Sequence, residues 1–163
     1  MGLFGRESDE NAREKAVSEL QRAGESITRI KTTFNSLKQR FPLSKPVALK
    51  ASDEQTLREF LNAIAQYTEK IFRNLEEIDK RAKSVYPSSE SVVKKLTTTL
   101  RQKVARITNG VFLARNRIPI SLAGNPTSMG EALMEIGGGL VDIEGSFANL
   151  SGVVTQTQVR RAA

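Results

Sequence analysis

Apolar residues recur at alternating steps of four and three through almost the whole chain, and this heptad spacing limits the fold more than any other feature. The spacing puts one apolar stripe on each helix and is typical of helices that pack as in coiled coils. Strand-like alternation of useful length does not compete with it. The sequence therefore predicts an all-α protein whose helices bury their stripes against one another.

Four separate stretches carry the spacing, and we predict helices at about 9–41, 53–86, 88–118 and 128–158. The stripe residues are, in the first stretch, Ala16, Leu20, Ala23, Ile27, Ile30, Phe34, Leu37 and Phe41; in the second, Leu57, Leu61, Ile64, Thr68, Ile71, Leu75, Ile78, Ala82 and Val85; in the third, Val93, Leu96, Leu100, Val104, Ile107, Val111, Ala114 and Ile118; and in the fourth, Met129, Leu133, Ile136, Leu140, Ile143, Phe147, Leu150 and Val154.

Prolines and capping residues indicate where these helices end and begin. Pro42, Pro87 and Pro119 fall at the breaks in the pattern, where a missing N–H group stops a helix. Ser52 and Ser128 each have a Gln or Glu three residues later, which is the spacing of a capping box. We therefore expect the second helix to be capped by Ser52, the third to end at Pro119 and the fourth to be capped by Ser128.

The matched lengths of the four helices predict their arrangement. Each has about 30 residues and a length of roughly 45 Å, so an antiparallel four-helix bundle would cover every stripe from end to end. The alternative is an extended helical hairpin in which the second and third helices form one bent rod. In either case residues 9–158 form one domain, between an apolar and basic segment at 1–8 and a basic tail at 159–163.

The composition argues against an enzyme. The chain has no Cys and no His, which excludes thiolate and imidazole chemistry and the usual zinc and haem ligands. The acidic cluster of Glu76, Glu77 and Asp79 is followed at once by Lys80 and Arg81, so ion pairs account for it. We expect no cofactor, no metal and no small-molecule substrate, and a location in the cytoplasm with peripheral membrane attachment as an option.

The charges are unevenly distributed along the chain. Of the 25 basic residues, 23 lie at or before Arg117, whereas residues 118–159 hold four carboxylates and no base. Such asymmetry suits an anionic partner or head-to-tail contact between copies. The third helix is the most basic, and its candidate residues for binding an anionic surface are Lys94, Lys95, Arg101, Lys103, Arg106, Arg115 and Arg117.

That basic strip could follow the phosphates of lipid or of nucleic acid, or it could simply be a solvated exterior. Phe112 is the only aromatic residue in the third helix, so bases have no stacking platform there. Base-specific recognition is therefore not expected.

Three consecutive glycines, Gly137–Gly139, interrupt the fourth helix without disturbing its heptad register. A phosphate cradle and a flexible hinge are alternatives, but the continuous register favours a helix at a cost of about 1 kcal/mol per glycine. Small residues let another backbone approach closely. The candidate face for helix packing or self-association, either within the bundle or between subunits, consists of Met134, Gly138, Val141, Gly145, Ala148 and Gly152.

The first six residues, MGLFGR, combine Leu3, Phe4 and Arg6 in the manner of a peripheral membrane anchor. Together with the long basic helical hairpin at residues 9–118, this start resembles the ESCRT-III and phage-shock-protein-A superfamily. The resemblance implies helical subunits that polymerise on anionic membranes, with Leu3, Phe4 and Arg6 as the anchor. Two features depart from that family: the first connection has eleven residues, PLSKPVALKAS, and Pro87 interrupts the second helix.

The function that fits these features is a non-catalytic, self-assembling helical protein that associates with an anionic surface, with a membrane as the first choice. One alternative is a nucleic-acid-coating or virion structural protein. Another is a purely structural bundle that mediates protein–protein contacts. The expected partners are further copies of the chain together with an anionic lipid surface or a nucleic-acid backbone.

Overall fold

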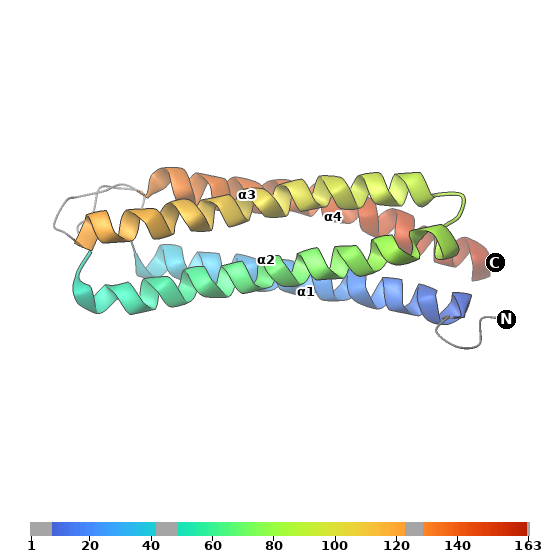
Figure 1. Ribbon diagram of the computed structural model, residues 1–163, viewed down its shortest axis with the longest axis horizontal. Helices are drawn as coiled ribbons and strands as arrows, with labels where there is room; N and C mark the ends of the chain where they lie inside the picture. Colours follow the sequence, from blue (N-terminus) through green and yellow to red (C-terminus); the bar gives the residue numbers. More distant parts are fainter. Residues whose placement is uncertain (1–7, 42–48, 123–128, 163) are drawn as a thin grey trace.

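The fold is an all-α, antiparallel four-helix bundle. The computed structural model describes residues 8–41, 49–122 and 129–162. The four helices are α1 (Asp9–Arg40), α2 (Ala51–Val85), α3 (Glu90–Leu122) and α4 (Gly130–Ala162). Figure 1 shows them alternating in direction, with the α2–α3 turn, the start of α1 and the end of α4 at the same end of the bundle. The predicted fold class is confirmed.

Each helix packs on the next one in the chain, and α4 closes the bundle against α1. The α1–α2 and α3–α4 contacts are the most extensive and the α1–α4 contact is the least. The alternative arrangement, in which α2 and α3 form one bent rod, is wrong, because α2 ends at Val85 and α3 returns along it from Glu90. Tyr86 precedes Pro87, which disfavours helical dihedrals, and its carbonyl accepts a 2.9 Å bond from the Ser89 N–H of the turn.

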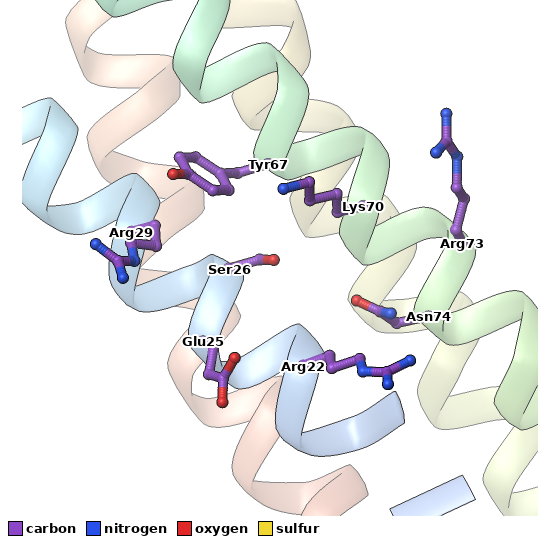
Figure 2. Close-up of a pocket in the computed structure, with 8 residues that line it drawn as sticks. All are labelled: Arg22, Glu25, Ser26, Arg29, Tyr67, Lys70, Arg73 and Asn74. Carbon is purple, nitrogen blue, oxygen red and sulfur yellow. The ribbon is translucent and has the colours of Figure 1, made fainter. Parts of the chain in front are cut away.

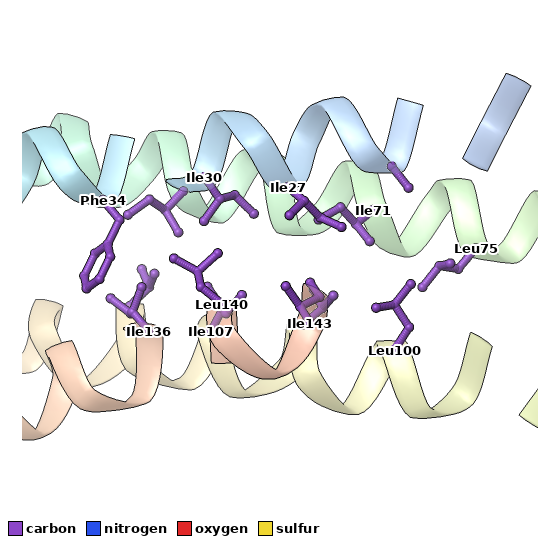
Figure 3. Packing of buried hydrophobic residues seen from close by; sticks show 14 of the residues in the cluster. Ile27, Ile30, Phe34, Ile71, Leu75, Leu100, Ile107, Ile136, Leu140 and Ile143 are labelled. Atoms are coloured by element: carbon purple, nitrogen blue, oxygen red, sulfur yellow. The ribbon is translucent and has the colours of Figure 1, made fainter. Parts of the chain in front are cut away.

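The predicted stripes form the core. Nearly all of their residues are buried, and Figure 3 shows the side chains of all four helices meeting along the bundle axis. Leu96, Leu133 and Phe147 are exceptions, being only partly buried. Ala132 is buried beside Leu133 because the backbones of α3 and α4 approach closely at that level.

Two helix ends differ from the prediction. The Ser52 capping box is wrong, since α2 already begins at Ala51; the N-cap is the extended Lys50, whose side chain makes no capping bond within the described residues. The end of α3 also differs from the prediction: Pro119 does not end this helix, which continues to Leu122. The added turn is held by the buried Ser121, whose Oγ accepts a 2.8 Å bond from the Leu49 N–H.

The remaining ends follow simple rules. Ser8 caps α1, its Oγ accepting a 3.2 Å bond from the Asn11 N–H. Phe41 is extended because Pro42 follows it.

Helix α4 continues through the three glycines and on to Ala162, so most of the predicted 159–163 tail belongs to that helix. The anchor candidates Leu3, Phe4 and Arg6, and the cap candidate Ser128, lie outside the described residues.

Candidate functional site

The basic residues of α3 lie on the flanks of that helix and mostly pair with neighbouring helices. Arg101 forms an ion pair with Asp79 of α2, which also accepts a 2.6 Å bond from Thr97. Arg115 donates to Asn62 of α2, while Lys94 pairs with Glu90 within α3 at 3.0 Å. The residues of α3 that are exposed to solvent are mainly uncharged. The continuous positive strip expected on α3 is therefore largely used in holding the bundle together.

The carboxylates of α4 complete this pairing. Arg106 lies 3.4 Å from Glu135 and 3.2 Å from Asp142, and Asp142 is also 4.0 Å from Lys103. The other two carboxylates of α4 pair as Glu131 with Arg117 at 3.9 Å and Glu144 with Lys31 of α1. Each carboxylate of α4 thus has a cation within the same chain. Among the seven α3 candidates, Lys95 alone has a side chain without a hydrogen bond or ion pair to the described residues.

The glycines of α4 have three different surroundings. A methyl group on Gly139 would lie 2.7 Å from Ile107 Cγ1 and 3.2 Å from the Lys103 carbonyl oxygen, so the α3 backbone runs directly against it. The Arg106 guanidinium covers Gly138, and the Phe34 ring packs at ordinary distance from Gly137. The close packing expected of the triple glycine is thus made within the bundle.

The rest of the candidate packing face on α4 is exposed. Met134 and Val141 are each 72% exposed. Gly145 and Gly152 have open space where a side chain would be, and Ala148 is exposed between them. This outer face of α4, defined as Met134, Val141, Gly145, Ala148 and Gly152, borders the α1–α4 contact, where Val141 lines a groove of about 360 Å³.

A second, more polar groove lies between α1 and α2 and has a volume of about 670 Å³. Its lining residues, shown in Figure 2, are Arg22, Glu25, Ser26, Arg29, Tyr67, Lys70, Arg73 and Asn74. In that view Arg22 and Ser26 of α1 and Tyr67, Lys70 and Asn74 of α2 point towards the space between the helices. Glu25, Arg29 and Arg73 point away from its centre in this view.

A buried polar network forms one wall of this α1–α2 groove. Glu19 is buried, and its Oε1 accepts a 2.9 Å bond from Arg22 Nη1 while its Oε2 accepts a 2.7 Å bond from Asn74 Nδ2. Because a buried carboxylate is tolerated only when paired and hydrogen-bonded, this network fixes the register of α1 against α2. It also fixes the position of the buried Asn74 side chain at the groove.

The charge of the α1–α2 groove is predominantly positive. Arg73 pairs with Glu69 at 3.3 Å, and Lys70 Nζ lies 5.2 Å from the centroid of the Tyr67 ring. Neither Arg29 nor Lys70 has an ion-pair partner among the described residues. The lining carboxylate Glu25 points away from the groove and Arg73 is paired, which leaves the exposed side chains of Arg22, Arg29 and Lys70 to bind an anion such as a phosphate group.

Sequence reasoning missed this groove. Arg22 and Arg29 are seven residues apart, and each directly precedes a stripe residue, as Lys70 and Asn74 do on α2. Positions that flank a heptad stripe face the neighbouring helix, so this spacing was an available signal. What it could not reveal was which two helices would be neighbours at that level.

Other classes of site find no support in the part of the chain that the structure describes. Within residues 8–41, 49–122 and 129–162, no cluster of carboxylates could hold a metal ion. No helix of that part has a long enough apolar stretch to cross a membrane. Comparisons with models of known families, with curated proteins and with solved structures find no match to this chain.

Proposed function

We propose that the protein is a non-catalytic helical scaffold that binds anionic membrane surfaces through the α1–α2 groove and associates with further copies through the outer face of α4. The observation that supports the proposal most is the cationic lining of the groove. Two of its cations, Arg29 and Lys70, form no ion pair with a carboxylate of the described residues. The apolar and basic MGLFGR segment supports a membrane over nucleic acid as the anionic partner.

The arrangement of the helices allows both contacts at once. Helix α1 packs between α2 and α4, so the α1–α2 and α1–α4 sides are adjacent sides of the bundle. A bundle that lies on a membrane with its α1–α2 side still exposes the outer face of α4 laterally. Copies could then pack beside one another on the same surface.

Reversing the two unpaired charges of the groove tests the membrane contact. We expect Arg29→Glu with Lys70→Glu to weaken binding to vesicles containing anionic phospholipid by at least about tenfold, because each cation near such a surface contributes roughly 1 kcal/mol. Co-sedimentation at low and physiological salt measures the change. The matched control is Lys83→Glu with Lys95→Glu, which alters the net charge equally outside the groove and should change binding by about twofold or less.

Two results would contradict the membrane contact. An equal loss in the groove variant and in its control would assign binding to net charge alone. Binding to duplex DNA without binding to vesicles would favour the nucleic-acid-coating alternative.

The oligomeric state tests the second contact. We expect the wild-type protein to gain mass with concentration in light scattering, and Met134→Lys with Val141→Lys to shift it to monomer at the same concentration. The two lysines would put charge in place of the exposed apolar side chains through which α4 is proposed to contact another copy. Phe112→Lys with Ile120→Lys, at exposed apolar positions of α3, is the control and should leave association intact. A wild-type protein that is monomeric at every concentration, with and without vesicles, would refute self-association.

A further inference from the structure

The α1–α2 groove contains a buried hydrogen-bond acceptor, Asn74 Oδ1, to which no group among the described residues donates. Asn74 is only 8% exposed. Its amide cannot be reversed to relieve this, because Nδ2 donates to Glu19 Oε2 at 2.7 Å and a carboxylate only accepts. A buried acceptor without a donor is unfavourable, so the groove favours a ligand that brings a donor.

The surrounding charges restrict the chemistry of that donor. Arg22, Arg29, Lys70 and Arg73 line the same groove and would repel an ammonium group, whereas they attract a phosphate. The donor is therefore a neutral hydroxyl carried by an anionic ligand. Arg22 borders Asn74, and its side chain is 64% exposed, so it can rotate to let a hydroxyl reach Oδ1.

We propose that the groove selects phospholipid headgroups that combine a phosphodiester with free hydroxyl groups, as the glycerol headgroup of phosphatidylglycerol does. Lys70 and the neighbouring guanidinium groups hold the phosphate, and a headgroup hydroxyl donates to Asn74 Oδ1. This inference rests on the proposed membrane function and adds a preference among lipids of equal charge.

The wild-type protein is compared on two kinds of vesicle that carry the same fraction of anionic lipid. One contains phosphatidylglycerol and the other phosphatidylethanol, a phosphodiester of the same charge whose headgroup has no hydroxyl. We expect phosphatidylglycerol vesicles to bind about five- to tenfold more tightly, the effect of one hydrogen bond to a buried acceptor.

A pair of variants assigns this preference to Asn74. Glu19→Gln replaces one carboxylate oxygen by an NH2 group, which can donate to Oδ1 once the Asn74 amide turns over, so the acceptor is satisfied within the protein. Glu19→Gln with Asn74→Leu removes the acceptor without leaving an unpaired buried carboxylate. We expect both variants to lose the preference while binding phosphatidylethanol vesicles as before, and Lys83→Glu with Lys95→Glu, outside the groove, to keep it; circular dichroism confirms that all three are folded.

The outcomes separate this inference from the proposed function. Equal binding of wild-type protein to both vesicles overturns the headgroup preference and leaves the membrane function standing, and this comparison needs no variant. Binding to neither vesicle overturns both. If soluble glycerol 3-phosphate shifts the NMR signals of the Asn74 amide while vesicles do not bind, the ligand chemistry stands and its lipid source is refuted. Preferential binding of single-stranded RNA over both vesicles also refutes the lipid source.

Discussion

Replacing Gly110 with alanine is expected to lower the free energy of unfolding by about 2 kcal/mol, although alanine is the better helix former. The added methyl group would lie 2.6 Å from Ile136 Cγ1 and 2.9 Å from both the Ala132 carbonyl oxygen and the Ile136 backbone nitrogen. Overpacking of this kind costs about 1–3 kcal/mol or more. Here the neighbours include backbone atoms, so relief requires α3 and α4 to move apart, and the cost exceeds the gain of about 1 kcal/mol in helix propensity.

Gly145→Ala is the matched control for this substitution. Gly145 lies in α4 with nothing within 4 Å of an added methyl group, so alanine should stabilise the protein by about 0.5–1 kcal/mol through helix propensity. Urea unfolding followed by circular dichroism measures both variants. Opposite signs for the two substitutions are the expected result; stabilisation by both would mean that α3 and α4 are farther apart at Gly110 than the structure places them.

Tyr86→Phe is expected to make the protein more resistant to alkaline unfolding. Tyr86 is fully buried, and its hydroxyl has no hydrogen-bond partner among the described residues. Burial raises the pKa of Tyr86 to about 12, and the positive charge of Arg13 only partly opposes this. The folded state therefore holds the phenolic proton more tightly than the unfolded state does. Ionisation of Tyr86 leaves the free energy of unfolding unchanged below about pH 10 and lowers it as the pH rises to about 12.

Two pKa units correspond to roughly 2–3 kcal/mol, which is the expected advantage of Tyr86→Phe over the wild-type protein near pH 12. At pH 7 the variant should be equal to the wild type or more stable by up to about 1 kcal/mol, since a buried hydroxyl without a partner is removed. Urea unfolding at pH 8, 10, 11 and 12 gives the comparison, in which titration of the shared lysines cancels. The same pH dependence in both proteins would contradict the assignment of the slope to Tyr86.

The core could be predicted from the sequence because it depends on a pattern within each helix. Ile27, Leu75, Ile107 and Ile143 are buried because heptad spacing puts them on the inner stripe whichever helices are neighbours. Phe147 departs from this because its ring packs across Gly24 of α1 and stays partly exposed. Contacts of that kind depend on the partner helix.

The candidate site was less predictable, because its contacts likewise depend on which helices are neighbours. Arg106 looked like part of an outward basic strip until the structure placed Glu135 and Asp142 beside it. The position of Asn74 beside the stripe indicates that it faces a neighbouring helix, but its burial depends on meeting Glu19 of α1, which the sequence does not show. The distinction between cations that hold the bundle together and cations that remain unpaired is a property of helix pairs. The resemblance to the ESCRT-III and phage-shock-protein-A superfamily stays a prediction.

The weak contact between α1 and α4 has a consequence for the order in which the bundle forms. The hairpins α1–α2 and α3–α4 join helices that are adjacent in the chain, and their contacts are the most extensive. The α1–α4 contact joins the first and last helices, as the pairing of Lys31 with Glu144 illustrates, and closing so long a loop has the largest entropic cost. We expect this contact to form last during folding and to open first in the native state, so that side chains buried between α1 and α4 become accessible to solvent before those buried within either hairpin.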